Sequence, residues 1–131
     1  MLQLTKDNFK TEVEEHDGLV VIDLYADWCG PCKMLAPTIE QLSSEMPDVK
    51  FAKVNVDNEP ELARAFNVSS IPMIALVKDN TFLDMSVGYV PKSTLEKLIG
   101  EYRYNMLTPS PNRHDSGFCY APVSRFAIFK R

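Results

Sequence analysis

The amino-acid sequence predicts an α/β fold in which helices cover both faces of one central sheet. Strand-like and helix-like patterns alternate along residues 1–102, and one segment, Leu19–Ala26, is apolar on both faces apart from a single aspartate. A strand of that kind belongs at the centre of a covered sheet. The length of 131 residues suits one domain with its own hydrophobic core.

The N-terminal elements are predicted from a helix-capping residue, an apolar pair and a glycine. Leu2–Leu4 is a candidate edge strand. Thr5 is placed to cap a helix in which Phe9 and Val13 stand four residues apart, and Gly18 ends that helix.

A second helix and another strand follow the central strand. The helix begins near Gly30, and its apolar residues are spaced as one helix face requires: Leu35, Ile39, Leu42 and Met46. Pro37 lies inside this helix and should bend it, because proline donates no hydrogen bond and crowds the carbonyl of Lys33. Val49–Asp57 is the next predicted strand.

A short helix and a hairpin come next. Asn58 and Glu61 have the spacing of a capping box and predict a helix over Pro60–Phe66. The pattern then changes to two apolar strands with a tight turn between them. These strands and their turn are Met73–Val77, Asp79-Asn80 and Thr81–Val87.

A last helix opens at Pro91 with the capping pair Ser93 and Glu96. Its apolar residues share one stripe: Leu95, Leu98, Ile99 and Tyr102. The elements therefore occur in the order β-α-β-α-β-α-β-β-α. Strands that alternate with helices predict a mostly parallel sheet, and the final hairpin adds an antiparallel edge.

Composition and charge divide the chain near residue 103. Residues 1–102 hold 9 Lys/Arg and 17 Asp/Glu, a net charge of −8, whereas residues 103–131 hold 5 and 1, a net charge of +4. We therefore predict a domain over 1–102 and a C-terminal extension over 103–131. The acidic domain disfavours nucleic acid as a partner. No apolar run is long enough to span a membrane, and the N-terminus lacks a secretory-signal pattern, so we expect a cytoplasmic protein.

Two closely spaced cysteines lie where the central strand passes into a helix. Cys29 at the helix start would face unpaired backbone N–H groups and the positive end of the helix dipole, which favour a thiolate. We predict that Cys29 is the nucleophile and that Cys32 is the resolving thiol. Gly30 lets the backbone turn closely, and Pro31 suits the first helical turn because it needs no N–H partner.

Two other interpretations of this cysteine pair have to be weighed. Cys29 and Cys32 could be buried thiols without chemistry, but the strand-to-helix context is typical of a redox motif. They could also bind zinc together with His114 and Cys119. The 81 residues between the two pairs and the stiff Gly-Pro dipeptide disfavour zinc, so we predict no metal site.

Asp23 is the one carboxylate in the central strand, six residues before Cys29. Burial disfavours the charged form, so its pKa should be raised. Its position near the carboxyl end of the strand is where α/β sheets place their sites. We predict that Asp23 accepts and donates the proton of Cys32. The alternative is a structural ion pair with a lysine such as Lys53, which we expect to modulate Asp23 rather than to act as a separate catalyst.

The residues around the cysteine pair closely resemble the active-site signature of the thioredoxin family. The resemblance runs over residues 21–37, which include Trp-Cys-Gly-Pro-Cys-Lys at 28–33. Lys53–Asp57, Ile71-Pro72 and Val87-Gly88 fall at further landmarks of that family, and the whole resemblance covers about residues 1–102. A proline at Pro72 also fits a strand start, because a sheet tolerates proline at an edge, a bulge or a beginning.

This resemblance implies a thioredoxin fold, with a central mixed five-stranded sheet, four helices and a cis Ile71-Pro72 bond facing the cysteines. It implies a general protein dithiol–disulfide oxidoreductase with a redox-active Cys29–Cys32 disulfide and no other cofactor. A thioredoxin reductase would re-reduce it, and disulfide-containing client proteins would be its substrates. We expect a monomer with no nucleic-acid or membrane partner. A substrate groove would be formed by Trp28, Gly30, Pro31, Ile71, Pro72 and Gly88.

Some positions depart from the family pattern. Tyr25 stands where many members have Trp or Phe, Ser70 where Gly is frequent, and Asn80 where a hairpin Gly is usual. A redox-insensitive scaffold is an alternative function, but a scaffold would have no need for the cysteines, Asp23 and Pro72 together. An oxidase or isomerase is disfavoured by Gly-Pro, the dipeptide of reducing members, and by the missing signal.

Residues 103–131 have no counterpart in a minimal member of that family. We interpret them as an unstructured or loosely docked extension without a redox role. The alternative is that the +4 extension folds back on the −8 domain and that Cys119 forms a disulfide with Cys29, which would block the groove.

Overall fold

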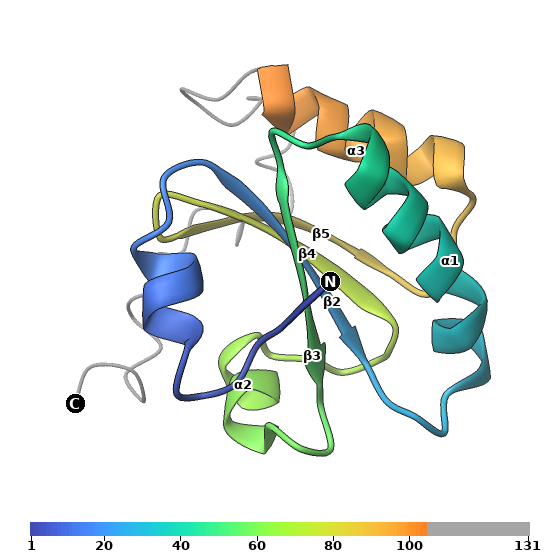
Figure 1. The fold of residues 1–131 in the computed structure, drawn as a ribbon. Helices are drawn as coiled ribbons and strands as arrows, with labels where there is room; N and C mark the ends of the chain where they lie inside the picture. Colours follow the sequence, from blue (N-terminus) through green and yellow to red (C-terminus); the bar gives the residue numbers. More distant parts are fainter. Residues whose placement is uncertain (105–131) are drawn as a thin grey trace.

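The computed structural model describes residues 1–104. Within these residues, a five-stranded sheet lies between two layers of helices, as Figure 1 shows. The interpretations that involve His114 or Cys119 lie outside the described residues. The elements are β1 (Leu2–Gln3), the π-helix η1 (Lys10–Glu14), β2 (Leu19–Tyr25), α1 (Gly30–Glu45), β3 (Lys50–Asn55), α2 (Pro60–Ala65), β4 (Met73–Lys78), β5 (Thr81–Val87) and α3 (Lys92–Tyr104).

The sheet has the strand order β1-β3-β2-β4-β5, with β2 at its centre as predicted. The first three strands of this order are parallel, but β4 runs antiparallel to β2 and β5 antiparallel to β4. The sheet is thus mixed and five-stranded, as the resemblance implied. The mostly parallel sheet expected from the alternation of strands and helices is wrong, because β4 also pairs antiparallel with β2.

The direction of β4 has a physical cause in the connection that precedes it. The α2 helix has six residues and therefore covers about 9 Å, whereas a six-residue strand covers about 20 Å. Such a short helix does not carry the chain back to the other end of the sheet. As a result, Met73 at the start of β4 lies beside Leu24 near the end of β2, and the segment before β4 reaches the same sheet edge as the cysteines.

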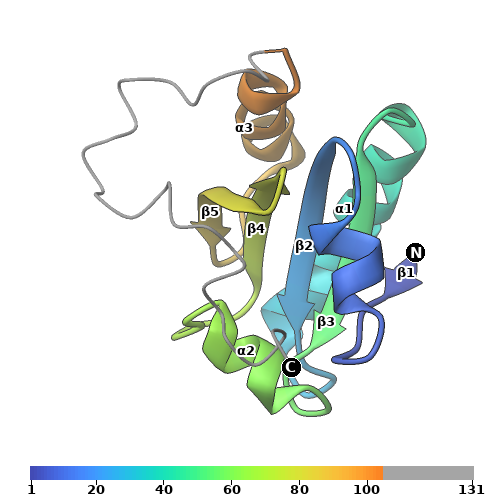
Figure 2. The ribbon, with the colours of Figure 1, turned by 90° about the vertical axis from the view of Figure 1, so that its left-hand side faces the viewer.

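Two hydrophobic cores fill the spaces between the sheet and the helices. Even-numbered residues of β2, from Val20 to Leu24, pack with η1 and α2, whereas Leu19 and Val21 pack with α1 and α3. Figure 2, which views the sheet from another side, shows the helices on its opposite faces. Because side chains alternate along a strand, Asp23 and Tyr25 lie on the α1 side.

The helix starts differ from the sequence prediction at all three places. Thr5 and Asn8 do exchange hydrogen bonds, Asn8 N–H to Thr5 Oγ1 at 3.3 Å and Thr5 N–H to Asn8 Oδ1 at 2.8 Å. However, η1 begins at Lys10 with Phe9 as its N-cap and no side-chain cap bond, so Thr5 is not its N-cap. The capping box predicted at Asn58 is wrong, because the N-cap of α2 is Glu59, without a side-chain cap bond. Ser93 lies inside the first turn of α3, which already begins at Lys92.

Pro37 and the hairpin turn lie where the sequence places them. Pro37 is inside α1, and the bend expected there stays a prediction. Asp79 and Asn80 have φ of 52° and 62°, the positive values that a tight hairpin turn requires and that Asn tolerates. Among residues 1–104, none of the helices has the length and apolar character to cross a membrane.

Candidate active site

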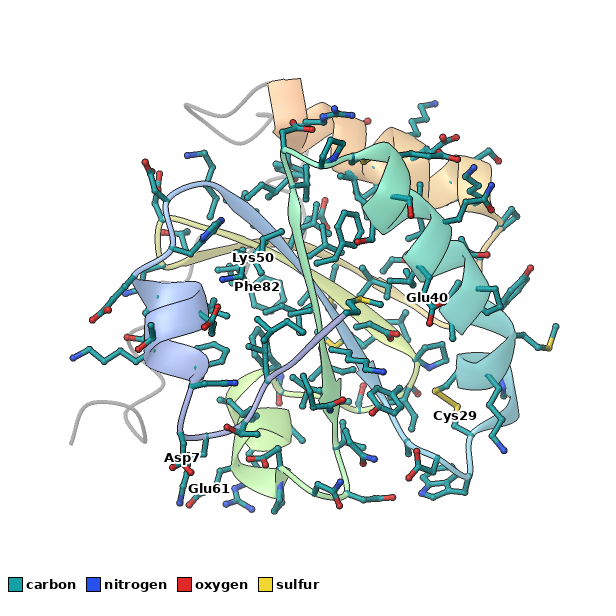
Figure 3. The ribbon with its side chains drawn as sticks, in the orientation of Figure 1. Asp7, Cys29, Glu40, Lys50, Glu61 and Phe82 are labelled. Carbon is teal, nitrogen blue, oxygen red and sulfur yellow. A yellow bond between two sulfur atoms is a disulfide. The ribbon has the colours of Figure 1, made fainter. Side chains whose placement is uncertain are left out.

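The Cys29–Cys32 pair lies at the beginning of α1, at the carboxyl end of β2. Cys29 is the N-cap residue, with extended backbone at φ −89° and ψ 111°, and Gly30 and Pro31 open the helix. The Cys32 backbone N–H donates to Cys29 Sγ at 3.2 Å. The two sulfurs are joined in a disulfide, which Figure 3 shows at the foot of α1. Both side chains are nearly buried, whereas Gly30 and Pro31 are exposed.

The Ile71-Pro72 segment lies against this pair. Its peptide bond is cis, as the resemblance implied. Ile71 packs against the small cluster that contains both cysteines, and Pro72 is buried at the start of β4. The Gly88 N–H donates to the Pro72 carbonyl at 2.7 Å, and Gly88 has a φ of +87°, which favours glycine. The structure therefore brings Ile71, Pro72 and Gly88 together beside the disulfide.

Trp28 is exposed but held in place. Its side chain is 71% exposed, and its Nε1–H donates to Asp57 Oδ2 at 2.8 Å. The Asp57 N–H in turn donates to Asn55 Oδ1 at 3.0 Å, and Asn55 Nδ2 donates to Asp27 Oδ2 at 3.4 Å. The buried Asn55 amide thus connects the loop after β3 with the loop that carries Trp28.

Asp23 is buried beneath α1, with 4% of its surface exposed. Burial raises its pKa from 3.8 to about 6, and the positive charge of Lys53 opposes part of that rise. Lys53 lies directly opposite on β3. Nevertheless, no ion pair within 4.0 Å joins the two among the described residues, and Asp23 Oδ1 has no hydrogen-bond partner there.

A pocket of about 150 Å³ is lined by both Asp23 and Cys32. The lining also includes Lys53 from β3, and Lys33 and Glu40 from α1. A pocket of this size has room for water, and Asp23 and Lys53 place polar groups in its lining. The geometry therefore allows a water molecule in this pocket to relay a proton between Asp23 and Cys32. In residues 1–104, no three His, Cys, Asp or Glu side chains are grouped to hold a metal ion.

Comparison with known proteins decides the family. The thioredoxin family model matches residues 1–101. The thioredoxin of Chlamydia muridarum (strain MoPn / Nigg) is 43% identical over 104 residues, which cover 79% of this chain and 100% of the relative. The thioredoxin of Bacillus subtilis (strain 168) is 40% identical over 103 residues, which cover 78% of this chain and 97% of the relative.

The chain belongs to the thioredoxin family. Its fold is the thioredoxin fold, and it is a protein dithiol–disulfide oxidoreductase whose redox centre is the Cys29–Cys32 disulfide. Members of the thioredoxin family reduce client disulfides and are re-reduced by a thioredoxin reductase. The predicted fold and activity are thus confirmed.

Sequence reasoning missed several residues of this thioredoxin-family site. Asn55 and Asp57 were noted only as part of a family landmark, and their bonds to the Trp28 loop depend on two strand ends meeting in space. The sequence also did not predict three exposed apolar side chains. Met34, Val87 and Tyr89 are 63%, 46% and 48% exposed. No periodicity distinguishes them from core residues, because exposure is set by the folded structure.

Proposed function

We propose that the residues of this site divide the reduction of a client disulfide into two steps. In the first, the Cys29 thiolate attacks the client disulfide, forms a mixed disulfide and releases one client thiolate. In the second, Cys32 loses its proton, and its thiolate attacks Cys29 Sγ. The second client thiolate leaves and is protonated, and the Cys29–Cys32 disulfide remains. Two electrons thus pass from the dithiol to the client disulfide.

The placement of the two sulfurs at the start of α1 supports these roles. Cys29 Sγ accepts the Cys32 backbone N–H at 3.2 Å, and a hydrogen bond of this kind is stronger to a thiolate than to a thiol. Cys29 is also the N-cap residue, where the helix dipole favours negative charge. Cys29 is therefore the sulfur that the fold activates for attack.

The observation that carries the proton-transfer role is that Asp23 and Cys32 line one pocket. Asp23 has a free carboxylate oxygen there. A pKa of about 6 leaves the carboxylate mostly ionised at pH 7, yet close enough to the working pH to release its proton in the reverse direction. Lys53 modulates this proton acceptor through its charge.

The substrate groove is proposed to surround the disulfide. Trp28 on one side and Ile71 on the other provide apolar walls, and the backbone beside the buried Pro72 would pair with an extended client segment by strand addition. Gly30 and Pro31 are exposed, Gly88 is half-buried, and none of the three has a long side chain, so a client chain can approach closely.

The remaining assignments concern the protein's surroundings. We propose a thioredoxin reductase and disulfide-containing proteins as partners, no cofactor or metal beyond the disulfide, and a monomer in the cytoplasm. The net charge of −8 over residues 1–102 disfavours nucleic acids and anionic membranes. We also propose that residues 1–102 form the catalytic domain and that 103–131 are an extension. The family match to residues 1–101 supports this division.

Insulin reduction followed by turbidity tests the cysteine roles. Wild type should be active, Cys29→Ser inactive, and Cys32→Ser should accumulate a mixed disulfide with insulin through Cys29. Cys119→Ser is the matched control, because it removes a thiol without touching the pair, and it should keep full activity. Activity that survives in Cys29→Ser would overturn the assignment of the nucleophile.

A further inference from the structure

The Lys53 side chain contacts an aromatic ring instead of the carboxylate opposite to it. Lys53 Nζ lies 5.7 Å from the centroid of the Tyr25 ring, within the range of a cation–π interaction. Asp23 and Lys53 occupy paired positions on β2 and β3. Neighbouring opposite charges on adjacent strands normally pair, yet these two form no ion pair among the described residues.

Tyr25 is itself fixed from two sides. Its hydroxyl donates to Gln3 Oε1 on the edge strand β1 at 3.3 Å. Its ring packs against the cluster formed by Ala26, Cys29 and Cys32. Tyr25 lies two residues after Asp23 on the same strand, so both side chains lie on the α1 face of the sheet. The ring is therefore a rigid platform beside the pocket that holds Asp23.

We propose that Tyr25 is a positioning residue whose ring holds the Lys53 ammonium away from the Asp23 carboxylate, so that Asp23 stays free to exchange a proton with Cys32. This inference rests on the proposed role of Asp23. Without the ring, the flexible Lys53 side chain would be free to turn to Asp23, which occupies the paired position on β2. A close ion pair would favour the ionised carboxylate over the protonated one.

Other charges face the same pocket and have to be held constant in a test. The titratable side chains that line it with Asp23 are Tyr25, Asp27, Cys32, Lys33, Glu40 and Lys53, and the amino-terminal residue lies there too. Of their charges, that of Lys53 opposes the effect of burial on the Asp23 pKa. The test therefore changes only Tyr25 and Lys53.

The experiment combines three substitutions of Tyr25 with two forms of residue 53. Tyr25→Phe keeps the ring and removes the hydroxyl, whereas Tyr25→Leu and Tyr25→Met remove the ring, the second with a flexible side chain that fills the space. Each is made with Lys53 and with Lys53→Gln in the full chain. Two quantities are measured: the Asp23 titration by carboxyl NMR, and the pH dependence of mixed-disulfide resolution in a single turnover.

With Lys53 present, Tyr25→Leu and Tyr25→Met should lower the midpoint of the Asp23 titration by roughly one pH unit, as for a carboxylate that gains a close cation. Resolution at pH 5 should then be faster by at most about five times, because the ionised fraction of Asp23 rises from about a tenth to about half while each ionised carboxylate becomes a weaker base. Tyr25→Phe should match wild type. With Lys53→Gln, none of the substitutions should move the midpoint.

Two results would overturn the proposal. One is an unchanged or raised midpoint in Tyr25→Leu and Tyr25→Met. The other is a fall of equal size with Lys53→Gln, which would mean that the ring acts by excluding water. Asp23→Asn separates this inference from the proposed function: if its resolution rate keeps the wild-type pH profile, the catalytic role of Asp23 fails, while the NMR titrations still decide whether Tyr25 controls Lys53.

Discussion

Replacing Asp23 by Asn should stabilise the protein, and the gain should depend on pH. The folded-state pKa of Asp23 is raised from 3.8 to about 6 by burial. Between these values, the folded protein binds more protons at this site than the unfolded chain, so stability falls as the pH rises through the window. Each pH unit of the difference corresponds to about 1.4 kcal/mol. The ionised form of Asp23 therefore costs about 3 kcal/mol at pH 7.

The advantage of Asp23→Asn over wild type should accordingly grow from below about 1 kcal/mol at pH 4 to about 3 kcal/mol at pH 7, and then level off. At pH 7 this corresponds to a rise in Tm of about 10 °C or more. Urea unfolding of the oxidised proteins at several pH values measures the difference. Asp17→Asn, at an exposed position, is the control. An equal advantage of Asp23→Asn at pH 4 and pH 7 would refute the reasoning.

Three further predictions concern activity, the tryptophan and the C-terminal helix. Resolution of the mixed disulfide should slow as the pH falls below about 6. Asp23→Asn should lose this dependence and be ~10²-fold slower at pH 7 in stopped-flow measurements, because it removes the proposed proton acceptor. Asp57→Ala should free the indole of Trp28, the single tryptophan, so the fluorescence anisotropy of this tryptophan should fall. The free energy of unfolding, measured in urea, should fall by only about 1 kcal/mol. Arg103→Ala should remove the two hydrogen bonds to Asp48, at 2.8 and 2.6 Å. These bonds lower the Asp48 pKa, so the loss in Tm should be present at neutral pH and vanish in acid, below that pKa.

The parts of the site that the sequence predicts are those set by neighbouring residues. The Leu19–Ala26 pattern predicts a central strand, and the change to a helical period after it predicts a helix start. Together they place Cys29 at the beginning of a helix from neighbouring residues alone. Strand alternation then places Asp23 on the α1 face, and the lack of a partner inside an apolar strand predicts its raised pKa. The thioredoxin-family resemblance adds the cis Ile71-Pro72 bond, which the structure contains.

Features that depend on how distant segments meet were not predicted. The direction of β4 depends on how far α2 carries the chain, and helix length is among the least certain properties of a sequence pattern. The roles of Asn55 and Asp57 arise where the ends of β2 and β3 come together. The N-cap of α2 is Glu59 and not the predicted Asn58. The Asn58 and Glu59 N–H groups both donate to the Asn55 carbonyl, so the turn before the helix closes one residue later than predicted.

The energetic cost of Asp23 is itself an argument for its chemical role. A loss of about 3 kcal/mol is a large part of the stability of a small domain, and an apolar residue would continue the pattern of β2 without that cost. An ion pair with Lys53 would also reduce the cost, and Lys53 stands opposite on β3. That pair would lower the pKa and weaken the carboxylate as a proton acceptor near neutral pH. The arrangement without an ion pair thus suits the proposed proton transfer at a cost in stability. Because the titration of Asp23 controls both properties, a substitution of Asp23 that restores stability should also remove the proposed proton acceptor.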